Sequence, residues 1–193
     1  MAPPAASVPA MSKKWKIVGA AVTTAALATG GIVVANQAGA AQSGPAATSY
    51  RATLIEMKTV GNAGYFYTAS QAEYNRARGL KFTNTGTPPG YVSTKAIRGT
   101  VAVYRLRNLK KSTYLLTLSA AERDKLSASK QWKYEGIVGR VPVAAAKDRV
   151  QVFRVSKGGT GGGWRVVRAS AVNAHKKAGW RVDGPMGYVW TTR

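Results

Sequence analysis

The sequence contains no cysteine, a single histidine and only seven acidic residues in 193 positions. Without cysteine, the chain has no disulfides, no thiolate metal site and no cysteine nucleophile. The single histidine, His175, excludes a site that needs two imidazoles from one chain. Against the seven acidic residues stand 29 Lys and Arg residues, so the formal net charge is +22. This charge predicts anionic surroundings or partners, but it does not indicate a fold.

The beginning of the chain has the order of a secretory signal: basic, then apolar, then small. The basic residues lie in 11–16, the apolar stretch 17–35 carries no charge, and Ala38 and Ala40 are the small pair before the expected cleavage. The alternative is an uncleaved membrane anchor, because the apolar stretch is close to the length that spans a bilayer.

This interpretation fixes the expected domain organisation. Residues 1–40 form the signal, residues 41–52 are small and polar and form a flexible lead-in, and residues 53–193 form one folded domain. Met1 and Met11 are alternative starts, because no charge precedes Met11. We expect the mature chain to be a secreted monomer of a bacterial cell envelope, with no membrane span after cleavage.

The folded domain contains five landmarks that occur three times in one order, about 49 residues apart. Two of them are a strand pattern, as at Val103–Leu106, and a serine followed after three residues by glutamate, as at Ser119 and Glu122. Spacing this regular indicates three internal repeats, each with two strands, a short helix and two more strands. The repeats cover residues 53–99, 101–149 and 150–192.

Four short strands, repeated three times, predict an all-β protein with short helical turns. The predicted architecture is a β-trefoil, a six-stranded barrel closed by three hairpins, because closure removes the exposed edges of a four-stranded unit. A propeller is disfavoured because three blades are fewer than the usual minimum of about four. An open solenoid is disfavoured because no capping repeat is visible.

Two features of the repeats predict local structure. A serine three residues before a glutamate predicts a helix capping box in the first two repeats, whereas Asn173 replaces the glutamate in the third and weakens that cap. Trp132 and Trp180 begin equivalent strands. We expect both to be buried, because Leu80 occupies their position in the first repeat.

The middle repeat resembles a secreted repeat domain of unknown function with lectin-like β-trefoil character. The shared residues are Tyr104-Arg105-Leu106, Thr117, Ser119, Glu122-Arg123-Asp124, Trp132 and Tyr134-Glu135-Gly136. The resemblance covers about Thr53 to Trp190 and implies a non-catalytic module that binds carbohydrate or cell wall. The chain differs from the family just before the second strand of each repeat, where the family has an aspartate-histidine pair. In this chain, those positions are occupied by Ala63-Gly64, Ser112-Thr113 and Gly162-Gly163.

The sequence predicts no catalytic constellation. His175 stands beside two lysines and is interpreted as a solvated helix residue rather than as a triad member with Asp183 or Asp148. The seven carboxylates form no recognisable glycosidase pair, and no His/Asp/Glu cluster predicts a metal site. The glycine-rich stretch 158–163 precedes a strand, which favours a hairpin loop over a phosphate cradle.

Aromatic and basic side chains are the candidate ligand-binding residues. Rigid rings stack on the C–H faces of sugars, and we expect the rings at the hairpin tips to be exposed. Arg105 and Arg107 alternate along one strand, so they share a face from which cations can attract acidic groups. The candidate binding site comprises Tyr65, Tyr114, Trp164, Arg105, Arg107, Lys110 and Lys111.

We therefore expect a secreted, non-catalytic binding module for a cell-surface or extracellular carbohydrate or wall polymer, with no cofactor. The alternative is a basic interaction protein that binds anionic polymers or a partner protein by charge alone. A hydrolase is a minor alternative. Specific nucleic acid binding is not expected, because no helix-turn-helix or aromatic RNA-binding motif is present.

Overall fold

The structure is a computed structural model that describes residues 50–159 and 162–193. The chain divides into two units, 1–43 and 44–193, and every described residue belongs to the second. The expected signal 1–40 therefore lies outside the described residues, as does the apolar stretch 17–35. No helix in the described part is long and apolar enough to cross a membrane.

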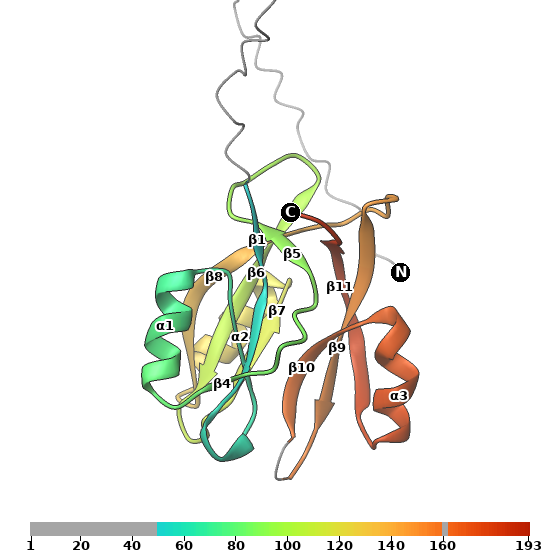
Figure 1. The fold of residues 1–193 in the computed structure, drawn as a ribbon. Helices are drawn as coiled ribbons and strands as arrows, with labels where there is room; N and C mark the ends of the chain where they lie inside the picture. Colours follow the sequence, from blue (N-terminus) through green and yellow to red (C-terminus); the bar gives the residue numbers. More distant parts are fainter. Residues whose placement is uncertain (1–49, 160–161) are drawn as a thin grey trace, which may run out of the picture. The chain divides into compact units, whose positions relative to one another are not determined.

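The order strand, strand, helix, strand occurs three times along the described chain (Figure 1). We call the stretches that carry it the first (53–99), second (101–149) and third (150–192) segments. The first contains β2 (Ile55–Lys58), β3 (Tyr65–Thr68), α1 (Gln71–Gly79), β4 (Thr83–Asn84) and β5 (Tyr91–Ser93). The second contains β6 (Thr100–Asn108), β7 (Tyr114–Thr117), α2 (Ala120–Ala128) and β8 (Trp132–Pro142). The third contains β9 (Arg149–Lys157), β10 (Gly163–Arg168), α3 (Val172–Lys177) and β11 (Arg181–Trp190).

The strands form two antiparallel sheets. The larger has eight strands in the order β10-β9-β11-β5-β8-β6-β7, with β1 (Arg51–Thr53) paired to β5, and the smaller has the order β3-β2-β4. The predicted β-rich architecture is confirmed, and the strand pairs of both sheets are antiparallel. Residues 51 and 52, however, were expected in the flexible lead-in and belong to a strand.

The described strands do not form the closed six-stranded barrel that was predicted. The last strand of the second and third segments is continuous, with 11 residues in β8 and 10 in β11. The same part of the first segment is broken into β4 and β5, with Pro88 and Pro89 between them. Because proline has no N–H to donate to a ladder, the hairpin of the first segment stays in a separate sheet.

The helix starts agree with the predicted caps. The side chain of Ser70 accepts a hydrogen bond from the backbone N–H of Glu73 at 3.3 Å, and Ser119 does the same for Glu122 at 3.1 Å. The third helix, α3, has no side-chain cap. The two glutamate side chains do not complete a capping box, however, because each is held by an arginine described below.

The core confirms the burial of Trp132 and Trp180, which are 8% and 9% exposed. The reason given from sequence was wrong, because Leu80 is 66% exposed. Phe82 is the true counterpart: its N–H donates to Ala77 O, as the N–H of Trp180 does to the equivalent carbonyl at the end of α3. The alignment of the first repeat is therefore displaced by two residues at this point.

The three hairpin tips meet around Thr113, which is 3% exposed. A Cβ atom added to Gly64 would overlap the side chain of Thr113, and one added to Gly163 would lie 2.8 Å from its Oγ1. Thr59 Oγ1 also links two tips, donating to Ser112 O at 2.6 Å. These are the positions where the similar family has aspartate-histidine. In this chain, the residues at these positions pack closely against one another.

Gly64→Ala is expected to lower the free energy of unfolding by about 1–3 kcal/mol, because the new methyl group has no space beside Thr113. Denaturant unfolding followed by circular dichroism measures the loss. Adding Thr113→Gly should restore part of it, since the overlapping side chain is removed. Gly79→Ala is the matched control, because nothing lies within 4 Å of that position. A Gly64→Ala variant as stable as this control would contradict the proposed contact.

Candidate binding site

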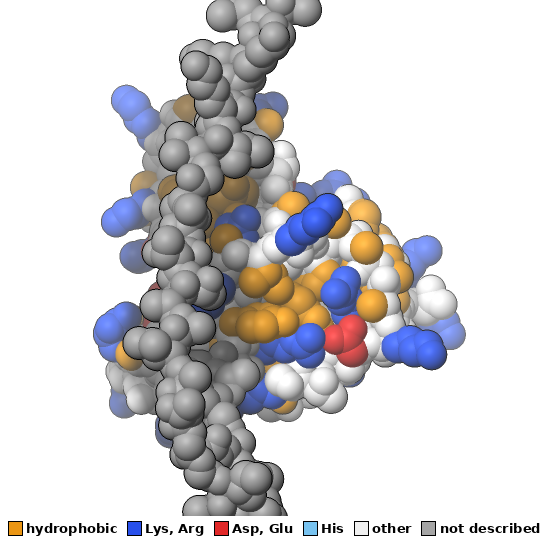
Figure 2. All heavy atoms as spheres, turned by 90° about the horizontal axis from the view of Figure 1, so that it is seen from above, with side chains coloured by type: hydrophobic (Ala, Val, Ile, Leu, Met, Phe, Trp, Pro, Cys, Tyr) orange, Lys and Arg blue, Asp and Glu red, His pale blue; other side chains and the backbone are white. Residues whose placement is uncertain are grey.

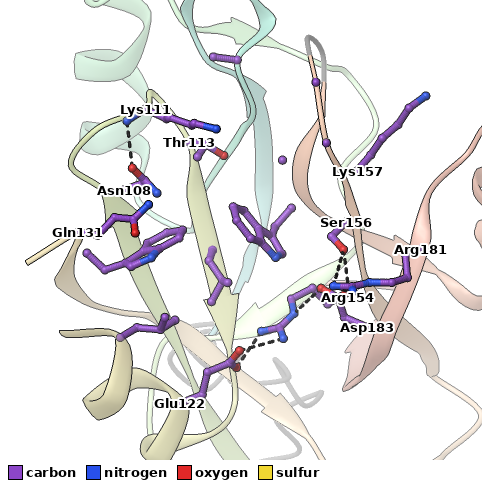
Figure 3. A pocket seen from close by; sticks show the side chains of 18 of the residues that line it. Asn108, Lys111, Thr113, Glu122, Gln131, Arg154, Ser156, Lys157, Arg181 and Asp183 are labelled. Carbon is purple, nitrogen blue, oxygen red and sulfur yellow. Dashed lines mark hydrogen bonds and ion pairs between the residues drawn. The ribbon is translucent and has the colours of Figure 1, made fainter. Parts of the chain in front are cut away.

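A pocket of about 1040 Å³ lies between the second and third segments (Figure 3). The second segment contributes residues from β6, β7, α2 and the start of β8, and the third contributes residues from β9, β10 and β11. The walls therefore come from strands and a helix rather than from loops alone. A site built on such elements is held in shape before a ligand arrives.

An aromatic pair forms one wall of the pocket. Trp132 starts β8 and Trp164 lies in β10, and their rings meet edge to face, with centroids 5.3 Å apart and planes at 75°. Trp132 is buried with Leu106 and Leu115, whereas Trp164 is only partly buried against this cluster. The exposed part of the Trp164 ring can therefore contact a ligand, while Trp132 fixes its orientation.

The guanidinium group of Arg154 also lines the pocket and lies between the carboxylates of Glu122 and Asp183 (Figure 3). It donates two hydrogen bonds to Glu122, at 2.8 and 3.0 Å, and one to Asp183 at 3.2 Å. Asp183 also accepts from Ser156 Oγ at 2.7 Å. Burial by itself would raise the pKa of Glu122, but the hydrogen bonds from Arg154 and Thr117 outweigh it, so the pKa lies below 4.5.

The same arrangement occurs 49 residues earlier, between the first and second segments. Arg105 donates two hydrogen bonds to Glu73, at 2.6 and 3.0 Å, and one to Glu135 at 3.0 Å. The backbone carbonyl that each arginine binds is also equivalent, Tyr67 O for Arg105 and Leu116 O for Arg154. Both networks tie a strand of one segment to the helix of the preceding one.

A smaller pocket of about 520 Å³ accompanies the Arg105 network. Phe82 and Tyr114 meet edge to face in it, with centroids 6.4 Å apart, as Trp132 and Trp164 do in the larger pocket. Arg107 and Lys133 also line this pocket. The two pockets thus share an aromatic pair and an arginine held by carboxylates.

In the contact between the third and first segments the charges are reversed: a glutamate takes the place of the arginine, and its partner is an arginine. We call this the reversed contact. Glu56, at the strand position of Arg105, is 1% exposed and accepts from Arg165 at 2.8 and 3.0 Å and from Tyr67 Oη at 2.5 Å. The pKa of Tyr67 lies well above 10. Burial is the main cause, and the nearby charge of Glu56 raises the pKa further. The aromatic pair is Tyr65 and Trp180, with centroids 6.1 Å apart, and both rings are buried.

A family model for a domain of unknown function, DUF5648, matches residues 54–190. The chain belongs to the DUF5648 family. Neither a curated protein nor a solved structure matches the chain. The match spans all three segments, so the DUF5648 domain includes both pockets and the reversed contact.

The sequence-predicted site residues are distributed over the DUF5648 domain rather than gathered at one place. Trp164 and Lys111 line the larger pocket, Tyr114, Arg105 and Arg107 line the smaller one, and Lys110 lines a third depression beside it. Two expectations were wrong. Tyr65 is 8% exposed rather than exposed at a hairpin tip, and Arg105 is 6% exposed and ion-paired rather than a free surface cation.

Sequence analysis missed three polar residues of the larger pocket: Arg154, Glu122 as an ion-pair partner, and Asp183. The signal was present, because Arg154 lies 49 residues after Arg105, which is the spacing of the predicted repeats. His175 was also misjudged. Its ring lies 3.1 Å from Arg165 Nη1 through Nε2 and 2.9 Å from Ala171 O through Nδ1, so it is not simply solvated.

All seven carboxylates of the chain form ion pairs with arginine. In the described part of the chain, these ion pairs involve no lysine, so the lysine charges remain uncompensated. On the face shown in Figure 2, basic side chains lie around hydrophobic ones, and the acidic group in full view lies against basic side chains. The DUF5648 domain therefore offers anionic ligands many cations and no free acid.

Proposed function

We propose that the DUF5648 domain is a secreted, non-catalytic module that binds an acidic carbohydrate polymer of the cell surface in the larger pocket. The observation that carries the proposal is that Trp164 and Arg154 line one pocket. A partly exposed indole can stack on a sugar ring, and the ion-paired guanidinium of Arg154 can orient a nearby hydroxyl group. The acidic groups of the polymer would meet the cations of Lys111, Lys157 and Arg181, which also line the pocket.

We also propose that the three segments are copies of one unit around a pseudo-threefold axis, as in a β-trefoil whose barrel is incompletely closed. Three aromatic pairs support this: Phe82 with Tyr114, Trp132 with Trp164, and Trp180 with Tyr65. Each joins the end of one segment's helix region to the second strand of the next segment, in cyclic order. The ligand pocket would then be one of three related contacts between units.

The absence of a free carboxylate favours binding over hydrolysis. Glycoside hydrolysis needs one carboxyl group as an acid and another as a base or nucleophile. The carboxylates in the larger pocket, Glu122 and Asp183, are both held by Arg154. The pKa of Glu122 is lowered by the hydrogen bonds from Arg154, so this carboxylate is a poor proton donor at neutral pH.

The second candidate function is binding of anionic polymers by charge alone, without a defined pocket. The specific observation that favours it is the complete pairing of the carboxylates, which leaves the remaining basic groups as unopposed charge. The two functions differ in their response to salt. Charge-driven binding weakens steeply with ionic strength, whereas stacking in a pocket persists.

Trp164→Ala is expected to weaken binding of the recognised glycan by about 10- to 100-fold, since it removes the exposed ring of the pocket. An array of glycans and purified wall polymers, probed at about 50 mM and about 500 mM NaCl, identifies the ligand and measures the loss. Tyr188→Ala, a half-buried aromatic in β11, is the control. Binding that disappears at high salt and is unchanged in Trp164→Ala would reject the pocket and favour the charge-driven function.

A further inference from the structure

Two leucines project from neighbouring loops at one end of the described domain. Leu80 follows α1 and is 66% exposed, and Leu109 follows β6 and is 53% exposed. Figure 1 shows the C-terminal end of α1 and the β6–β7 turn at the same end. Both leucines line one depression of about 370 Å³, together with Phe82 and Tyr114. Exposed large apolar side chains grouped in this way mark an interaction surface.

The backbone that presents Leu80 is fixed. Its N–H donates to Arg76 O at 3.1 Å, and the next residue, Lys81, has a φ of 67°. Phe82 N–H then donates back to Ala77 O at 3.0 Å, which closes the end of the helix. The leucine is therefore held outward by the helix terminus rather than by a loose loop.

The turn that presents Leu109 is fixed in a similar way. Leu109 N–H donates to Gln131 O at 2.8 Å. The side-chain oxygen of Asn108, which is 4% exposed, accepts from the N–H groups of Lys110 and Lys111 at 2.9 and 3.0 Å. Because both leucines are held in place before binding, little ordering of the chain opposes their insertion into a partner.

The charged residues that line this depression are all basic. Arg107, Lys110 and Lys111 line the same depression and are exposed, and none of the described residues lining it is acidic. Leu80 also borders the smaller pocket, where Glu73 and Glu135 are both paired with Arg105. Lys81 stands beside Leu80. The surface thus combines protruding aliphatic side chains with a cluster of cations.

We propose that this surface, the Leu80/Leu109 surface, docks onto the face of an anionic lipid bilayer. The leucines enter the boundary between head groups and acyl chains, and the surrounding cations meet the lipid phosphates. A glycan or single-stranded nucleic acid would favour exposed rings for stacking, whereas the most exposed groups here are aliphatic. Lys111 lines both this depression and the Trp164 pocket, but neither leucine lines that pocket, so the proposal does not rest on the proposed carbohydrate ligand.

Vesicle binding of the full chain tests the proposal. Because the sequence has no cysteine, Ser112→Cys gives a single attachment point for an environment-sensitive dye in the depression, and Ala145→Cys gives one on the distant β8–β9 loop. Vesicles of phosphatidylcholine with about one-third phosphatidylglycerol are expected to shift the emission at position 112 to the blue, and not at position 145. Phosphatidylcholine alone should shift neither dye.

The leucines are tested in the Ser112→Cys background. Leu80→Ser with Leu109→Ser should weaken vesicle binding by about 10-fold or more. Ile137→Ser with Val143→Ser, at residues that are 51% and 56% exposed, is the control and should leave binding unchanged. Circular dichroism confirms that each variant is folded.

Three results would overturn the proposal: equal vesicle binding by the leucine variant, an equal shift with neutral vesicles, or an equal shift with soluble dextran sulfate. The last result would assign the surface to soluble polyanions. The Trp164→Ala variant should bind vesicles like the wild type, so the vesicle result and the glycan result are independent of each other.

Discussion

Replacing Glu56 by alanine is expected to lower the free energy of unfolding by about 3–5 kcal/mol, because the buried Tyr67 hydroxyl and the partly buried guanidinium group of Arg165 both lose the carboxylate that they share. Glu56 is 1% exposed and accepts hydrogen bonds from both Arg165 and Tyr67. In the alanine variant, the Arg165 charge and the Tyr67 hydroxyl lose this partner. Chemical denaturation followed by tryptophan fluorescence measures the change.

Two companion variants make the Glu56 result specific. Adding Arg165→Leu to Glu56→Ala removes the uncompensated charge and should recover part of the lost stability. Asp124→Ala removes a carboxylate whose partner, Arg123, lies beside it at the surface, and it should leave the unfolding midpoint unchanged. A Glu56→Ala variant that unfolds at the wild-type midpoint would show that the third and first segments do not depend on this contact.

Much of the order of strands and helices along the sequence was predictable, because short local patterns determine strands and helix starts. The serine caps of α1 and α2 and the burial of Trp132 and Trp180 follow from short patterns. The open sheet was not predictable from the same patterns. A trefoil needs three equivalent closing strands, and two prolines interrupt the ladder in only one of them.

The proposed binding site was harder to predict because its residues are adjacent only in space. Trp164 and Lys111 were found as an aromatic and a cation, but nothing in their local sequence places them with Arg154. The number of basic residues likewise does not show which of them are free to bind a ligand. Arg105 and Arg107 are two residues apart on one strand, yet Arg105 is bound to two carboxylates from other elements and Arg107 is exposed. Counting basic residues cannot separate these cases.

Arg105→Met is expected to destabilise the domain by about 3 kcal/mol, since it breaks a buried network that joins the first and second segments. The guanidinium group of Arg105 donates to Glu73, Glu135 and the Tyr67 carbonyl, and its side chain is only 7% exposed. Differential scanning calorimetry or denaturant unfolding measures the loss. Adding Glu73→Gln should restore part of it, because one unpaired carboxylate becomes neutral.

Arg154→Met provides the matched comparison at the equivalent position. Its network also joins one arginine to two carboxylates, but the carboxylates that remain are better compensated. Asp183 keeps its hydrogen bonds from Ser156 and Arg181, and the Glu122 side chain is 33% exposed to water. We therefore expect a smaller loss of stability from Arg154→Met than from Arg105→Met, together with weaker ligand binding in the larger pocket. Equal losses would contradict this argument, and no loss at either position would show that these arginines do not hold the segments together. If the predicted difference is observed, the two equivalent arginines have different main roles. Arg105 then mainly stabilises the contact between the first and second segments, and Arg154 mainly supports ligand binding between the second and third.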